Sequence, residues 1–293
     1  VTRKIYDFTP EQLANLTSIV WWYRGQSGRF MGLVQQYLDR TIAEATSIAG
    51  RATAFQKAYT ALAEATEPFL KTWEAGAEPA KERDEAAEAC FASLNEWTAR
   101  IAKDWAKSCT EELPAQHARL TELEALATAC RDLVKDVDLV TKLASRLVDG
   151  CEKEVKASKQ NGNGNGNGDP EEWDRRSIRR LEKDLDARRK ELVEQLKRTA
   201  YFQRQAHWLL SRFPEAKFVA VPGLCRIVSR AEIEAADWSL TPGRYVGVAP
   251  PEVDEDFDFE QALRDIHVEL ADLNRQACAL AAKIQANFEG LGI

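Results

Sequence analysis

Two long amphipathic segments on either side of an alternating Asn-Gly run constrain this chain more than any other feature. The run, NGNGNGNG at residues 161–168, can neither bury a side chain nor hold a helix, so it predicts a surface loop. On both sides of it, apolar residues recur every three or four positions, as on one face of an α-helix. We therefore predict that segments 119–158 and 171–212 pair as an antiparallel helical hairpin, each covering the apolar stripe of the other.

Composition favours helices and excludes some classes of protein. Hydrophobic residues make up 44% of the 293 positions, many of them Ala and Leu, and Gly and Pro are few. No apolar run is long enough for a membrane span, and no signal-peptide pattern opens the chain. The net charge of −7 argues against general attraction to nucleic acid. Six widely spaced cysteines without a CxxC pair indicate reduced thiols in a cytoplasmic protein.

These patterns predict a mainly α fold. We expect a helical bundle with the long hairpin, a small irregular or β segment near 216–248, and a coiled-coil-like helix at the C-terminus. The division into domains that we expect is N-terminal helices at 1–50, a helical region at 51–213 and a C-terminal region at 214–293.

The first helix has a clear start signal. Thr9 is a suitable N-cap, Pro10 suits the first helical position, and Gln12 completes a capping box with Thr9. Gly25 is the expected stop. One face of this helix is apolar and consists of Leu13, Leu16, Ile19, Val20 and Tyr23.

The second arm of the hairpin carries the one strong basic bias of the chain. Between Arg175 and Arg204 there are 11 Lys/Arg and 5 Asp/Glu. One interpretation is contact with the backbone of a nucleic acid. The other is a solvated helix face with intrahelical ion pairs, for example at Glu182. The candidates for nucleic-acid contact are Arg175, Arg176, Arg179 and Arg180.

A turn, an acidic stretch and a heptad-patterned helix follow one another near the C-terminus. Thr241-Pro242-Gly243-Arg244 is typical of a tight turn, in which Gly243 would supply a positive φ. Six carboxylates lie between Glu252 and Glu260. The seam that follows predicts a helix lying against another helix, within the chain or in a partner. It consists of Phe259, Leu263, Ile266, Leu270, Leu273, Ala277, Leu280 and Ile284.

Motifs that would carry chemistry are absent from the sequence. It contains no GxGxxG, GxxxxGK[ST], HExxH or GxSxG pattern. The histidines, His117, His207 and His267, have none of the neighbours that a helical metal site requires. The residues alone therefore predict a non-catalytic interaction module without a cofactor or a metal.

Two stretches resemble a known family. The first is RKIYDFTPEQLANLTSIVWWYRGQ, near the N-terminus, and the second begins PGLCRIVSRAEIEAADWSLTPGRYVG and ends NFEGLGI. They look like the segment after the catalytic core and the C-terminal end of the M subunit of type I restriction–modification DNA methyltransferases. The likeness covers roughly residues 1–40 and 200–293, and LTPGRYVG is its most specific part; the region between has no pattern that matches the family.

The resemblance implies an adenine-N6 methyltransferase that uses S-adenosylmethionine and works with a DNA-reading S subunit and a restriction R subunit. This chain lacks the family's Asn-Pro-Pro-aromatic motif and its Gly-rich cofactor loop, so no catalytic residue carries over. We expect a fragment that begins just after the catalytic domain and that contains no cofactor site. In the family the C-terminal helical region serves assembly with the S subunit. The expected partner-binding residues are Thr241, Pro242, Gly243, Arg244 and Tyr245 in the turn, and Leu263, Ile266, Leu270, Leu273, Leu280 and Ile284 in the seam.

Two alternatives remain at this point. One is an unrelated cytosolic helical scaffold or protein-interaction module. The other is an enzyme in its own right. The sequence favours this interpretation less, because it shows no paired acid and base.

Overall fold

The computed structural model describes residues 8–104, 112–160 and 173–249, together with helical positions 263, 266, 267, 270, 274, 277, 278 and 281. Two compact units make up the chain. The first contains Val1–Val221 and Cys225–Arg230, and the second contains Pro222–Leu224 and Ala231–Ile293.

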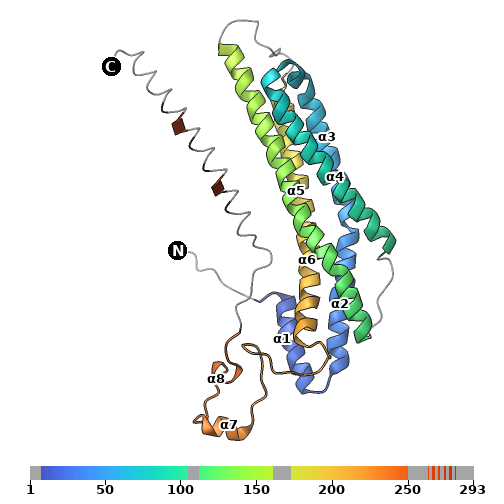
Figure 1. The fold of residues 1–293 in the computed structure, drawn as a ribbon, viewed down its shortest axis with the longest axis vertical. Coiled ribbons are helices and arrows are strands. Elements are labelled where there is room, and N and C mark those ends of the chain that lie inside the picture. The colour runs from blue at the N-terminus through green and yellow to red at the C-terminus, as the bar shows by residue number, and fades with distance from the viewer. Residues whose placement is uncertain are drawn as a thin grey trace. The chain divides into compact units, whose positions relative to one another are not determined.

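The described part is mainly helical, as predicted, and contains no β-strand (Figure 1). In chain order the helices are α1 (Pro10–Tyr23), α2 (Ser27–Thr46), α3 (Ile48–Thr72), the 3₁₀ helix η1 (Glu74–Gly76), α4 (Ala77–Asp104), α5 (Leu113–Gln160), α6 (Arg175–Arg212), α7 (Arg230–Ala235) and α8 (Gly243–Val246). None of the helices in the described ranges is long and apolar enough to cross a membrane.

The predicted hairpin is formed by α5 and α6, which run antiparallel in the first unit (Figure 1). Ion pairs between the two helices show that they are antiparallel. A residue farther along α6 pairs with a residue nearer the N-terminus of α5. Arg179 Nη2 lies 2.6 Å from Asp149 Oδ1, and Arg189 Nη1 lies 2.8 Å from Asp138 Oδ1. The Asn-Gly run at 161–168, expected at the tip, lies outside the described residues.

Helix α6 is central to the bundle because it packs against α5, α2 and α3. The other close pair is α4 with α5, while α1 packs on α2 and α6. The apolar stripes that identified the hairpin are buried, and they join one core with α2, α3 and α4. Aromatic rings fill the end near α1, where Trp22 and Phe30 lie 4.6 Å apart between ring centroids and Phe213 packs edge-on to Phe30.

The N-terminus of α1 confirms the predicted cap. Thr9 Oγ1 accepts a hydrogen bond from the amide of Gln12, and the Gln12 side chain accepts one from the amide of Thr9. The helix ends at Tyr23, and Gly25 has φ of 67°, a left-handed conformation that glycine adopts without strain.

The apolar face of α1, however, is not the face that packs against the bundle. Leu13, Val20 and Tyr23 are exposed, whereas Asn15 and Ser18 are buried together with Trp22. Hydrogen bonds decide the orientation. Asn15 Nδ2 donates to Gln205 Oε1 of α6 over 2.7 Å, and the Tyr37 hydroxyl of α2 donates to Asn15 Oδ1 over 3.0 Å. A pattern of hydrophobicity within one helix cannot reveal such distant polar partners.

The segment near 216–248, expected to be irregular or β, is irregular and belongs in part to each unit. The nearest approach to a strand in the described residues around 216–248 is an isolated antiparallel bridge between Val221 and Cys225. Gly223, at the turn between them, has φ of 74°, and its amide donates to the carbonyl of Val246 over 2.7 Å. The segment is therefore the irregular alternative of the prediction, not a β-hairpin.

Candidate functional site

The basic residues at the start of α6 lie in two different environments. Arg179 is bound by carboxylates from both arms of the hairpin: its Nε donates to Glu152 Oε1 over 2.8 Å and its Nη1 to Glu182 Oε2 over 2.6 Å. Arg175 Nε donates to the same Glu152 oxygen over 3.3 Å. These interactions hold the hairpin arms together, so two of the four predicted nucleic-acid-binding arginines have structural partners.

The electrostatics of Glu152 agree with that geometry. Its carboxylate is almost fully buried, but the hydrogen bond from Arg179 lowers its pKa below the ordinary value, against the opposing effect of burial. The three carboxylates around Arg179, led by Glu152, raise the pKa of its guanidinium. Both groups are therefore charged at neutral pH.

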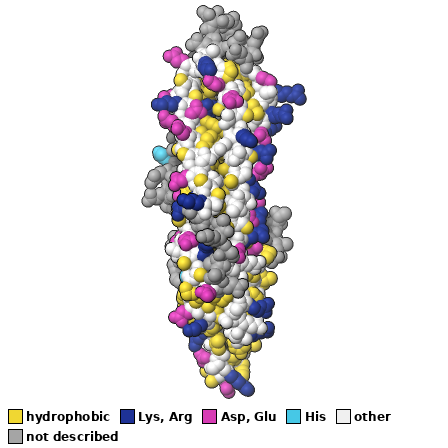
Figure 2. Space-filling model, turned by 90° about the vertical axis from the view of Figure 1, so that its right-hand side faces the viewer, with side chains coloured by type: hydrophobic (Ala, Val, Ile, Leu, Met, Phe, Trp, Pro, Cys, Tyr) yellow, Lys and Arg dark blue, Asp and Glu magenta, His cyan; other side chains and the backbone are white. Residues whose placement is uncertain are grey.

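Arg176 and Arg180, in contrast, are exposed, and neither forms an ion pair with a residue in the described ranges. The amide of Arg176 donates to Asp174 Oδ1, which caps the N-terminus of α6. Farther along α6, acidic partners are interspersed with the basic residues, as in the Arg188–Glu191 pair. The face drawn in Figure 2, which is the right-hand side of Figure 1, also shows both signs of charge. Arg176 and Arg180 are thus two exposed positive charges without an ion pair, among the described residues, at the first turns of α6.

The turn at Thr241–Arg244 forms, but Gly243 does not have the predicted positive φ. The amide of Arg244 donates to the carbonyl of Thr241 over 3.1 Å, and the chain continues as the single helical turn of α8. Because Pro242 is in the right-handed helical region, Gly243 follows it into the helix, and the positive φ of 71° occurs at Gly247, after the helix.

Side chains of the same turn tie α7 to α8 within the second unit. The Tyr245 hydroxyl donates to the carbonyl of Ser239, and Arg244 Nη1 donates to the carbonyl of Ala236 over 3.4 Å. Tyr245 is half-buried, whereas Thr241, Pro242, Gly243 and Arg244 are exposed. Of the five predicted partner-binding residues in the turn, four are therefore exposed, while Arg244 and Tyr245 each form a hydrogen bond within the second unit.

The described positions of the C-terminal heptad helix are helical and exposed. Leu263, Ile266 and Leu270 expose 49%, 60% and 55% of their surface, which is unusual for three large apolar side chains on one seam. Leu273, Leu280 and Ile284 lie outside the described residues.

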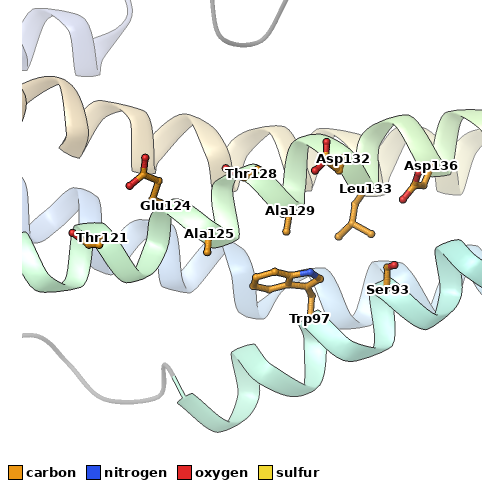
Figure 3. Close-up of a pocket in the computed structure, with 10 residues that line it drawn as sticks. All are labelled: Ser93, Trp97, Thr121, Glu124, Ala125, Thr128, Ala129, Asp132, Leu133 and Asp136. Atoms are coloured by element: carbon orange, nitrogen blue, oxygen red, sulfur yellow. The ribbon is translucent and has the colours of Figure 1, made fainter. Parts of the chain in front are cut away.

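A groove of about 710 Å³ runs between α4 and α5 (Figure 3). The Trp97 ring projects from α4 toward Ala125 and Ala129 of α5, while the carboxylate of Glu124 points away from it. Burial, and then the charge of Asp132, raise the pKa of Asp136 at one end of the groove. Its lining contains hydroxyl groups and carboxylates but no histidine, cysteine or lysine.

In the part of the chain that the structure describes, the histidines and cysteines do not form a metal site. His117 Nε2 lies 2.8 Å from the carbonyl oxygen of Pro214, and His207 is exposed. No cluster of His, Cys, Asp or Glu among the described residues could hold a metal ion. Cys130 and Cys151 are buried free thiols, and burial raises the pKa of each to about 12, so they are un-ionised core residues.

One polar cluster was not anticipated from the sequence. Glu44 of α2 is buried, and its carboxylate accepts hydrogen bonds from Gln195 (2.8 Å) and Arg198 (2.9 Å) of α6. Burial alone would raise the pKa of Glu44, but these partners, together with Arg40, lower it below the ordinary value. The signal in the sequence was the position of Glu44 on the apolar side of α2, where a charged residue requires a buried partner.

Comparisons with protein-family models, with curated proteins and with solved structures found no match to this chain.

Proposed function

We propose that the chain is a non-catalytic assembly region, namely the C-terminal helical part of the M subunit of a type I DNA adenine-N6 methyltransferase. In this proposal its C-terminal heptad helix binds the DNA-specificity S subunit, in a cytoplasmic complex that also includes the R subunit. S-adenosylmethionine would bind to the catalytic domain of the parent protein, not to this region. The family assignment rests on the two sequence stretches that resemble the M subunit.

The observation that carries the assembly role is the exposed apolar seam. Leu263, Ile266 and Leu270 are each about half exposed, at spacings of three and four residues. A seam of this period is buried when a second helix lies along it, and each large side chain then contributes roughly 1.5–3 kcal/mol.

A double substitution in the seam tests this role. In the parent M protein, Ile266→Asp with Leu270→Asp should abolish co-purification with the S subunit, because two charges would have to be buried in an apolar contact. The matched control is Ala271→Asp with Cys278→Asp, which adds the same charge to the same helix away from the seam, and should leave the complex intact. A complex that survives the seam variant would contradict the proposal. Loss of thermal stability in the M protein alone would instead place the seam in its own core.

A secondary role in contacting the DNA backbone is favoured by the two exposed arginines at the start of α6. Replacing Arg176 and Arg180 by Gln should weaken binding of the assembled complex to all DNA sequences alike, because phosphate contacts carry no sequence information. The slope of log affinity against log salt should become shallower by up to about 0.9 per lost contact. Fluorescence anisotropy at several salt concentrations measures both quantities.

The control for the DNA experiment is Arg188→Gln, since Arg188 is paired with Asp184 and Glu191 on its own helix. It should leave the salt slope unchanged. If the Arg176/Arg180 variant behaves like this control, the basic cluster is a solvated helix face.

A further inference from the structure

Helix α1 is attached to the bundle differently from the helix that follows it. It lies at the edge of the bundle, where it packs on α2 and α6 (Figure 1). Trp22 is its one buried apolar side chain, while Ile19 and Trp21 are half-buried. Helix α2 buries many more large apolar side chains, namely Phe30, Leu33, Val34, Tyr37 and Leu38. Since apolar burial supplies most of the free energy that holds a helix on a bundle, α1 is held less firmly than α2.

Polar contacts make up much of the remaining attachment of α1. The buried Asn15 side chain bonds to one partner on α2 and one on α6. Nearer the start of the helix, the Tyr201 hydroxyl of α6 lies 2.9 Å from Thr9 Oγ1 and 3.2 Å from Glu11 Oε2. Water can replace each of these hydrogen bonds when the helix leaves the bundle, so their net contribution to stability is small. They select the orientation of α1 but oppose its release only weakly.

The buried anchor of α1 is itself incompletely bonded. Trp22 packs against the rings of Phe30 and Phe213, with 4.6 and 6.3 Å between ring centroids. Its indole Nε1 is buried and has no hydrogen-bond partner among the described residues. A buried donor without a partner destabilises the packed arrangement, and it gains a hydrogen bond to water when the side chain is released.

The turn that joins α1 to α2 permits movement. Gly25 has the left-handed φ of 67°, and nothing lies within 4 Å of the position that a side chain on it would take. The residues that end α1 and begin α2, Tyr23 and Ser27, are exposed. Because glycine gives the backbone access to many conformations, this turn can change its dihedral angles without displacing a neighbour.

We propose that α1 is a latch, which opens and closes as one unit about the turn at Gly25 while the rest of the helical bundle stays folded. Opening uncovers the seat of Trp22, which is formed by the rings of Phe30 and Phe213. Elements with few buried apolar contacts open locally at a lower free energy than the core. The proposal rests on the contacts of α1 alone and does not depend on the function proposed above.

Hydrogen exchange of the full chain, measured by mass spectrometry, tests the latch. The amides of residues 13–23 should share one degree of protection, at least about 100-fold lower than that of residues 192–206 in α6. Leu185→Ala separates local from global opening, because Leu185 is completely buried in α6 about four helical turns before the contact with α1. This variant should lower the protection of α6 by at least about thirtyfold and leave that of α1 unchanged.

A variant of the polar contacts tests what holds the latch closed. Asn15→Ala should lower the protection of α1 by about tenfold, because the closed form loses two hydrogen bonds to the bundle. Thr17→Ala is the matched control on the same helix. The exposed Thr17 hydroxyl donates to the carbonyl of Leu13, within α1, so its removal should not speed exchange.

Thiol labelling gives a second measurement. Ser18 is buried on the inner side of α1, and Ser18→Cys places a thiol there with little change in size. This thiol should react at least about 100-fold faster than Cys130, a buried thiol of α5 that becomes accessible when the bundle unfolds. Circular dichroism melts verify that every variant folds.

Three results would overturn the proposal. The first is equal protection of α1 and α6, or an equal response of both helices to Leu185→Ala, since α1 would then open only by global unfolding. The second is labelling at position 18 that is as slow as at Cys130. The third is protection that rises steadily along α1, which would show fraying from one end instead of opening as a unit.

Discussion

Leu196→Ala should lower the stability of the helical bundle by about 2–5 kcal/mol, the cost of deleting a buried leucine side chain and leaving a cavity. Leu196 is completely buried in α6, the helix that packs against α2, α3 and α5. Collapse of the surrounding side chains can fill little of the space because three other helices constrain them. Chemical denaturation, followed by far-ultraviolet circular dichroism, measures the change in the free energy of unfolding.

The matched control for this experiment is Leu139→Ala. Leu139 lies on α5 with 47% of its surface exposed, so shortening it leaves no cavity and should change stability by less than about 0.5 kcal/mol. If both variants lose the same amount of stability, α6 is not the centre of the core.

Lowering the pH should destabilise the bundle, because it protonates buried carboxylates that are charged in the folded chain. The pKa values of Glu44 and Glu152 are lowered in the folded chain, so the fold favours their charged forms. Their contribution is fully present above the unfolded glutamate pKa of about 4.3 and is lost as the pH falls through the lower, folded values. We therefore expect the free energy of unfolding to decrease steadily as the pH falls below about 5.

Neutralising these carboxylates should remove part of that dependence. Glu44→Gln and Glu152→Gln should each lower stability by about 1.5–3 kcal/mol at pH 7, the contribution of hydrogen bonds to a charged group. The difference from the unaltered chain should shrink as the pH falls, because the native glutamates then become protonated too. Glu194→Gln, on the exposed side of α6, is the control and should leave the profile unchanged. A constant difference at every pH would show that the substitutions act through packing.

Much of the fold follows from local sequence. The capping box at Thr9 and the apolar period on both sides of the Asn-Gly run depend on residues within about one helical turn of each other. Their physical basis is local hydrogen bonding and the 3.6-residue repeat, so no knowledge of distant partners was needed. The antiparallel direction of α5 and α6 also follows, since a short connection leaves them no other way to pair.

The candidate surfaces were less predictable. The basic cluster of α6 could be read from the sequence, but the division between Arg179, bound to Glu152, and the exposed Arg180 could not. That division depends on which residue of α5 lies opposite each turn of α6. The turn predicted at Pro242 forms at that position, but the positive φ predicted for Gly243 was wrong because the residues after Pro242 continue into a helix.

The sequence by itself determined the helical class of this protein, the hairpin and the ends of its first helix, because these depend on neighbours a few residues away. Only the tertiary structure decided which face of α1 is buried and which acidic groups pair inside the bundle. Asn15 meets Gln205, and Glu44 meets Gln195, across 190 and 151 positions of sequence. A buried polar group is stable only with such a partner, so its position is set by the packed bundle and not by the hydrophobicity of its own helix.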